Sequence, residues 1–167
     1  MIVPGRRTRV VNKPRPEIEL VVRGVLINGD HILLVHSKKA RNTYLPGGHI
    51  EFGESAIAAL KREIREELGF RASVTGFLGC VEHGWTCAGI RNHEINLIFR
   101  MEFDCPVPGI NPVSRETKIE FWWRKINELK TARLEPRVLR KLLPEWLKKG
   151  IPGQWGSTLM PTRRGRK

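Results

Sequence analysis

Residues 48–70 read GHIEFGESAIAALKREIREELGF, and this stretch decides how the rest of the chain is interpreted. Its second half predicts an α-helix over residues 55–68, because Ser55 suits an N-cap and Gly69 suits the position after the last turn. At 100° per residue, four apolar side chains share one stripe of this helix, which we expect to face the core: Ile57, Leu60, Ile64 and Leu68.

Three carboxylates occupy a separate face of the predicted helix: Glu63, Glu66 and Glu67. Residues three and four apart on a helix are surface neighbours, so these like charges repel unless something neutralises them. A cation held among them would do so, and an all-oxygen ligand set favours magnesium, manganese or calcium over zinc. The alternative is a solvated face whose charge is neutralised by three basic neighbours, Lys61, Arg62 and Arg65.

The loop before the helix favours the metal interpretation. Residues 45–48 read LPGG, a glycine-rich segment whose backbone can approach a cation or a ligand closely. Glu51 and Glu54 add two carboxylates before the helix begins.

The whole stretch resembles the signature of the Nudix hydrolases, G-x5-E-x7-R-E-U-x-E-E-x-G-U, in which U is a bulky apolar residue. Gly48, Glu54 and the run from Arg62 to Phe70 fill every required position at the required spacing. A match at nine fixed positions is a specific signal. The order of the flanking strands also resembles the family's domain, over residues 18–132.

The resemblance implies an α/β/α sandwich with a mixed β-sheet and a magnesium- or manganese-dependent hydrolase. Such enzymes cleave a pyrophosphate bond in a nucleoside diphosphate linked to another group. A polyanionic pyrophosphate needs its charge neutralised before water attacks, and a metal also lowers the pKa of that water. In family terms, the metal ligands would be Glu63, Glu66, Glu67 and the Gly47 carbonyl, while Glu54 and Arg62 would orient the loop and the helix.

The signature segment, residues 48–70, is called the Nudix box, or the box, below. A further catalytic acid is expected outside it, because family members often carry one on a later loop near a tryptophan. Glu116, which lies seven residues before Trp123, is the first candidate, and Glu94 is the second. By strand alternation, Glu94 could equally be an exposed strand residue.

Substrate-binding candidates lie on both sides of the box. Tyr44 and Trp85 could stack a base, and Arg41 could meet phosphates. Glu94, already a candidate acid, is the fourth substrate-binding candidate. Core packing or loop anchoring is the alternative for the aromatic residues, and solvated exposure is the alternative for the arginine. Family members that cleave ADP-ribose often carry a proline shortly after the box, and dinucleoside-polyphosphate members a tyrosine. The segment 83–86, HGWT, has neither, so the sequence does not select a nucleotide.

The remaining elements follow from local patterns. Residues 19–37 read as a β-hairpin with Asn28-Gly29 as its tight turn. Further strands are expected at 72–83, 93–103 and 119–124, and a second helix at 135–149, where leucines and a tryptophan recur at helical spacing. The order of strands, helix, strands and helix predicts an α/β domain in which helices cover a mixed sheet.

The formal net charge of +13 lies outside residues 17–132, which contain fifteen basic and fifteen acidic side chains. Residues 1–16 carry a net charge of +5, and residues 133–149 and 161–167 carry +4 each. We expect a basic N-terminal segment (1–16), a Nudix domain that includes the C-terminal helix (17–149) and a basic C-terminal tail (150–167). The ends could hold nucleic acid through phosphate attraction. Solvated tails are favoured, because no aromatic residues interleave with the terminal arginines.

Composition favours a cytoplasmic protein that does not enter a membrane. The N-terminus lacks the apolar stretch of a signal peptide, and no apolar run is long enough for a membrane span. The three cysteines form no C-x-x-C pair, and Cys80, His83 and Cys87 fit no zinc pattern, so we expect ordinary thiols. The oligomeric state is open, with a homodimer as one option.

Two classes of function are compatible with the sequence. The first is a hydrolase of small nucleotide pyrophosphates. The second is a Nudix-fold sensor that binds a nucleotide without turnover, and a narrower enzymatic variant is an RNA-end pyrophosphohydrolase that uses the basic ends. The complete box favours the hydrolase, because a binding-only descendant would be free to lose its acids.

Overall fold

The structure is a computed structural model that describes residues 17–87, 89–105, 110–149 and 154–157. Its elements, in chain order, are β1 (Ile18–Asn28), β2 (His31–Ser37), β3 (Thr43–Tyr44), α1 (Ala56–Leu68), β4 (Ala72–Cys87), β5 (Ile90–Phe103), β6 (Ile119–Lys125), the 3-10 turn η1 (Ile126–Glu128), α2 (Leu139–Lys149) and β7 (Gln154–Ser157).

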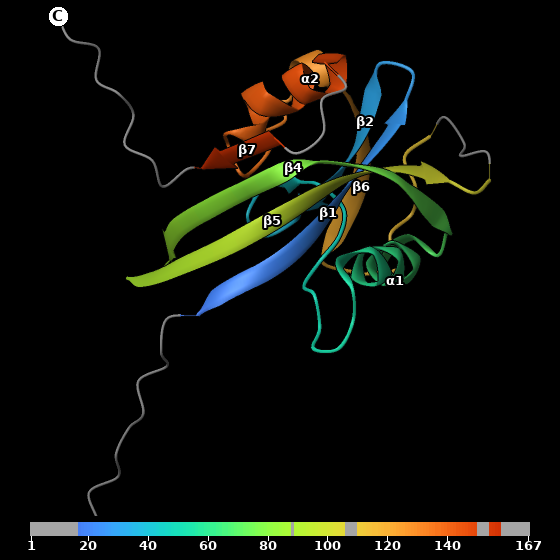
Figure 1. Cartoon of the computed structure of the whole chain (residues 1–167). Helices are drawn as coiled ribbons and strands as arrows, with labels where there is room; N and C mark the ends of the chain where they lie inside the picture. Colours follow the sequence, from blue (N-terminus) through green and yellow to red (C-terminus); the bar gives the residue numbers. More distant parts are fainter. Residues whose placement is uncertain (1–16, 88, 106–109, 150–153, 158–167) are drawn as a thin grey trace, which may run out of the picture.

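One mixed β-sheet carries a helix on each face (Figure 1). The strand order is β3-β2-β1-β5-β4-β7, and β6 pairs with β2. β1 runs parallel to β5 and β7 runs parallel to β4, whereas the other pairs are antiparallel. This arrangement confirms the predicted α/β/α sandwich with a mixed sheet.

Helix α1 confirms the capping signals read from the sequence. The Ser55 side chain accepts a hydrogen bond from the Ala58 backbone N–H. Gly69 has φ 75°, and its N–H donates to the Arg65 carbonyl, which ends the helix. The predicted core position of Ile57 is wrong, because Ile57 is 44% exposed while Ala59 and Glu67 are buried in its place. The buried face of α1 therefore includes Ala59 and Glu67 and excludes Ile57.

Several predicted boundaries are also wrong. Asn28 pairs with His31, so the hairpin turn is Gly29-Asp30 rather than Asn28-Gly29, with the positive φ at Gly29. α2 begins at Leu139 rather than residue 135, because a residue that precedes proline, here Glu135, disfavours helical backbone. β4 extends to Cys87 rather than residue 83, and β5 begins at Ile90 rather than residue 93, because the two strands pair along their whole length.

Two short strands were not predicted. β3 has only two residues and is held by pairing with β2. β7 falls within the expected C-terminal tail and pairs with β4. Both owe their conformation to a partner strand rather than to a local pattern.

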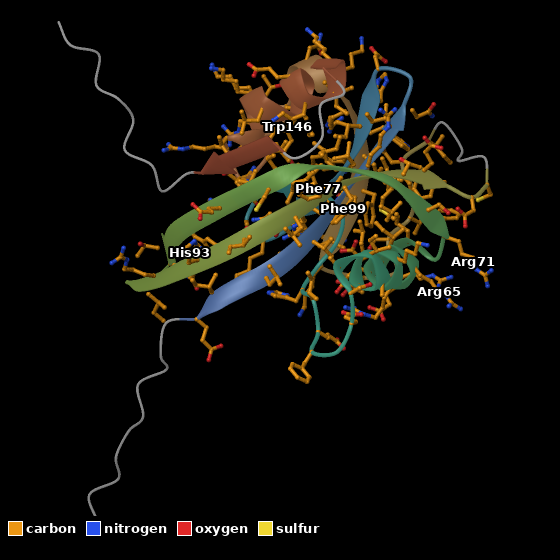
Figure 2. All side chains as sticks on the ribbon, viewed as in Figure 1. Arg65, Arg71, Phe77, His93, Phe99 and Trp146 are labelled. Carbon is orange, nitrogen blue, oxygen red and sulfur yellow. The ribbon has the colours of Figure 1, made fainter. Side chains whose placement is uncertain are left out.

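The core consists of two clusters separated by the sheet. The side chains of Leu60 and Ile64 from α1 pack with Val22 of β1 and Phe121 of β6 on one face. On the other face, the α2 residues Leu139, Leu143 and Trp146 pack with Leu34 and Ile98. Figure 2 shows Trp146 between α2 and the sheet.

In the part of the chain that the structure describes, neither helix is long and apolar enough to cross a membrane.

Candidate active site

The LPGG loop lies along β1, where β2 no longer pairs with it. The ladder between β1 and β2 covers only the residues next to the turn. Further along β1, the Gly24 N–H donates to the Pro46 carbonyl at 2.8 Å, and the Val22 N–H donates to the Gly48 carbonyl at 2.9 Å. The loop thus takes the place of a strand, and its backbone is fixed against the centre of the sheet.

Both glycines of this loop are required by close contacts. Gly47 has φ 126°, and a Cβ there would overlap the Val22 carbonyl. A Cβ on Gly48 would overlap the carboxylate of Glu63. The loop backbone and the acidic side of α1 are therefore in direct contact, as the sequence predicted for a glycine-rich segment.

Arg62 joins the loop to the helix. Its guanidinium donates to Glu54 at 2.6 Å, to Glu63 at 2.9 Å, to Glu66 at 3.2 Å and to the His49 carbonyl at 3.1 Å. These hydrogen bonds lower the pKa of Glu54 and raise that of Arg62. Three carboxylates of the box, those of Glu54, Glu63 and Glu66, are thus partly neutralised within the chain.

Glu67 is the buried acid of the site. Its side chain was expected on a face separate from the core, but only 5% of the residue is exposed. The Gly47 N–H donates to Oε2 of Glu67 at 3.4 Å. Burial raises the pKa of Glu67 to about 8, while the positive charge of Arg23 acts in the opposite direction.

The three box carboxylates have different surroundings. Glu67 is buried, the side chain of Glu63 is 18% exposed, and that of Glu66 is 57% exposed. Arg62 bridges Glu63 and Glu66. Across the described residues, no three acidic, histidine or cysteine side chains are already grouped closely enough to hold a metal ion.

Arg23 is a site residue that the sequence analysis missed. It donates to the Gly47 carbonyl at 2.7 Å and to the Leu45 carbonyl at 3.3 Å, and its guanidinium carbon lies 5.1 Å from the centre of the Tyr44 ring. The signal available in the sequence was an arginine in the middle of the apolar run of residues 20–26, LVVRGVL. An arginine in a buried strand needs polar partners, and here the loop supplies them.

Glu116 lies near the box although it is distant in sequence. The Arg115 N–H donates to the backbone carbonyl of Glu67 at 2.8 Å, which holds this loop at the C-terminal end of α1. The Glu116 carboxylate is exposed, and its negative charge contributes to raising the pKa of both Glu67 and Tyr44.

A cleft of about 560 Å³ opens on the α2 face of the sheet, lined by Arg23, Tyr44, His83, Trp85, Glu94 and Glu135 among others. The Trp85 side chain is partly exposed and stacks on His83, with ring centres 5.0 Å apart. Burial lowers the pKa of His83, so its ring favours the neutral form. The cleft thus combines aromatic surface with two carboxylates.

Glu94 is not the exposed strand residue that alternation allowed. It is only 8% exposed, and its Oε1 accepts a hydrogen bond from the Asn96 amide at 3.0 Å. Trp85 and Tyr44 also line the cleft, whereas Arg41 does not and instead lines a second hollow. The structure therefore brings together three of the four predicted substrate-binding residues.

The Cys80 and His83 side chains lie on opposite faces of β4, because successive strand residues alternate. Burial raises the pKa of the Cys80 thiol, which favours its protonated form.

Residues 18–146 match the family model of the NUDIX domain. This match covers most of the chain, and it includes the loop, α1, the cleft and most of α2. The chain therefore belongs to the Nudix family.

Individual relatives are similar over shorter segments. An ADP-ribose pyrophosphatase from Methanocaldococcus jannaschii is 32% identical over 88 residues, which are 50% of this chain and 50% of that protein. The chain spans half or less of the length of the curated relatives that it matches, namely 24%, 37% and 50% for three of them.

Solved structures show the same fold. A NUDIX hydrolase from Nitrosomonas europaea has a TM-score of 0.64 and 22% identity, covering 90% of this chain and 100% of that one. A UDP-X diphosphatase has a TM-score of 0.59 and 19% identity, covering 88% of this chain and 70% of that one. At these identities the likeness concerns the fold alone.

Proposed function

We propose that this chain is a metal-dependent hydrolase that cleaves the pyrophosphate bond of a nucleoside diphosphate linked to a second group. One observation carries the proposal: the complete Nudix box folds into a loop and a helix that bury the Glu67 carboxylate beside the Gly47 backbone. A buried carboxylate is costly unless a positive charge compensates for it.

The residues around Glu67 fit a hard divalent cation. The donors would all be oxygens, from the Gly47 carbonyl and the carboxylates of Glu63, Glu66 and Glu67. In the structure Arg23 contacts this carbonyl and Arg62 contacts Glu63 and Glu66, so a cation would replace these contacts. A cation would stabilise the charged form of Glu67 and so oppose the effect of burial on its pKa. When bound, magnesium or manganese would neutralise phosphate charge and acidify the attacking water.

Arg62 and Glu54 act as positioning residues in this proposal. Their hydrogen bonds hold the loop of residues 49–54 against α1, which fixes the carbonyls and the carboxylates relative to one another. Glu116 has no role as a metal ligand in this proposal. Its carboxylate is exposed and its charge acts on Glu67, so it is suited to assist proton removal from water.

The nucleoside would occupy the cleft on the α2 face. Trp85 offers a partly exposed ring for stacking, and Glu94 and Glu135 offer acceptors for base amino groups or ribose hydroxyls. One relative is named for ADP-ribose and one structural neighbour for UDP-X. The substrates to be tested therefore include both an adenine and a uracil nucleotide.

The test is release of phosphate-containing products from a panel: ADP-ribose, a UDP-sugar, nucleoside triphosphates and a 5′-triphosphorylated RNA. Each is incubated with magnesium, with manganese or with EDTA. We expect turnover of a small nucleotide by the wild type that EDTA and Glu67→Gln abolish. The exposed Glu102 is the matched control, and Glu102→Gln should retain turnover.

Nucleotide binding without turnover under every metal condition would instead support the sensor and contradict the hydrolase. Turnover confined to the RNA would support the RNA-end alternative. Residues 1–16 and 158–167, which that alternative uses, lie outside the described residues.

A further inference from the structure

A second hollow of about 560 Å³ lies on the same face of the sheet as the cleft. Its lining includes His36, Arg41, Trp122, Arg124, Glu128 and Arg133. Trp122 and Arg124 face the α2 side, because Trp122 pairs with Leu34, which belongs to the α2-side cluster. The hollow and the cleft share the segments 40–44 and 131–136 but take different residues from them.

We propose that this hollow, which we call the basic hollow, is a binding site for a phosphate-bearing anion, separate from the candidate active site.

The basic hollow is rich in positive charge. Arg41, Arg124 and Arg133 come from three different segments, and only one carboxylate, Glu128, lines the hollow with them. Within the described residues, none of the three arginines forms an ion pair with a carboxylate. Gathering like charges around one space is unfavourable unless an anion binds there, and guanidinium groups match phosphate oxygens in geometry.

Two arginines of the basic hollow have an unusual backbone conformation. Arg41 has φ 56° and Arg133 has φ 57°, and they are the only residues other than glycine with positive φ in the described part of the chain. This conformation is uncommon for arginine and persists only where the surroundings impose it. Both unusual conformations occur at the rim of the same hollow.

Thr43 connects the two strained segments. Its hydroxyl donates to the Ala132 carbonyl at 2.8 Å, and its N–H donates to the Arg133 carbonyl at 3.3 Å. The Arg41 N–H donates to the Ser37 carbonyl at 3.0 Å. The backbones of the two arginines are therefore held in place before any ligand arrives, which reduces the entropy cost of binding.

Side chains from the sheet hold Arg124 at the basic hollow. His36 stacks on Trp122 with ring centres 3.8 Å apart, and the Arg124 guanidinium carbon lies 4.6 Å from the centre of the Trp122 ring. Stacking orders Arg124 while its N–H groups remain able to donate in the guanidinium plane. Because Trp122 already has these two neighbours, the hollow offers charge and hydrogen bonds rather than a platform for a base.

His36 supplies an unused polar atom. Its Nδ1 is buried and has no hydrogen-bond partner among the described residues, since the nearest carboxylate oxygen, from Glu120, is 3.8 Å away. Buried polar atoms without partners are uncommon and point to a missing ligand or water.

The phosphate could belong to a free compound or to a nucleic-acid strand, and two probes separate these sources. The first is inorganic pyrophosphate, measured by calorimetry. The second is a short labelled single-stranded RNA, measured by fluorescence anisotropy at two salt concentrations. Both are added to the full-length chain in EDTA, so that neither probe is recruited by a metal ion.

The site variant is Arg124→Gln combined with Arg133→Asn, because asparagine tolerates positive φ. The control is Arg71→Gln combined with Lys148→Gln, which removes the same two charges from exposed positions outside the hollow. Figure 2 shows Arg71 beside α1, away from α2. We expect the site variant to weaken binding of at least one probe by about tenfold or more, and the control by no more than about twofold.

Weakening by the site variant alone supports the proposal, and the affected probe identifies the source of the phosphate. Equal weakening by both variants would show general charge attraction and would overturn the proposal. The proposal is also overturned if the wild type binds neither probe. Circular dichroism checks the fold. If the double variant is unfolded, Arg133→Asn alone replaces it and is judged against Lys148→Gln by the same criterion.

Discussion

The guanidinium of Arg62 holds the carboxylate of Glu54 with two hydrogen bonds, Nη2 to Oε1 at 2.6 Å and Nε to Oε2 at 3.3 Å. This paired geometry is the most specific contact between an arginine and a carboxylate. It joins the loop before α1 to the middle of the helix. The position of the loop relative to the box acids therefore depends on a pair of polar side chains as well as on core packing.

The first prediction concerns this pair. Arg62→Lys keeps the charge but loses the two-pronged contact, and Glu54→Gln loses the acceptor charge. We expect each to lower turnover of the substrate found in the panel by roughly 10–100-fold, as for other residues that orient metal ligands.

A double-mutant cycle checks the mechanism of that loss. Because both residues act through one contact, the double variant should be about as impaired as either single variant. Strictly additive losses would show that Arg62 and Glu54 act independently. Arg71→Lys is the matched control and should leave turnover unchanged.

The second prediction is a pH dependence of stability in the absence of metal. Below pH 4.5 the Glu67 carboxyl is protonated in both the folded and unfolded states, so burial carries no ionisation cost. Above that pH the unfolded state ionises first, and stability falls until the pH reaches the folded pKa of about 8. We expect Glu67→Gln, measured by thermal melting in EDTA, to reduce the loss of stability between pH 4.5 and 8. A wild-type profile that Glu67→Gln leaves unchanged would contradict the assignment.

The third prediction concerns the metal ion and thermal stability. A cation that binds only the folded arrangement of the box stabilises it by mass action. Millimolar magnesium should raise the melting temperature of the wild type and of Glu102→Gln, and should raise that of Glu66→Gln far less. An equal shift in all three proteins would place magnesium elsewhere.

The fourth prediction tests Glu116 as the assisting acid. If it removes a proton from the attacking water, Glu116→Gln should lower turnover by roughly 10²–10⁴-fold while metal affinity stays nearly unchanged. Glu67→Gln should instead weaken metal binding, and excess manganese should partly restore it. A near-normal turnover number for Glu116→Gln across pH 6–9 would remove Glu116 from the mechanism.

The fifth prediction tests the cleft. Trp85→Ala removes a partly exposed ring that stacks on His83 and makes no contribution to the box. If the ring stacks the nucleoside equally in the ground and transition states, KM should rise about tenfold with little change in kcat. Ile90→Ala, which removes an exposed apolar side chain outside the cleft, should leave both constants unchanged.

The sequence by itself determined the family resemblance, the fold class and the helix of the box. These features depend on local spacing: capping residues at Ser55 and Gly69, apolar positions at helical intervals, and acids at fixed distances from a glycine. Such patterns can be read from neighbours in the chain because the helix brings residues three and four apart together.

Only the tertiary structure decided the surroundings of each side chain. Glu63, Glu66 and Glu67 are equivalent in the sequence, but packing against the loop buries Glu67 and leaves Glu66 exposed. The place of Arg23 beneath the loop has the same origin.

The basic hollow depended still more on the fold. Arg41 is far in sequence from Arg124 and Arg133, and the three meet because β6 pairs with β2 while Thr43 fixes the segment before α2. Burial and long-range convergence depend on how the sheet and helices pack. A local pattern contains no information about which distant segment will lie beside it.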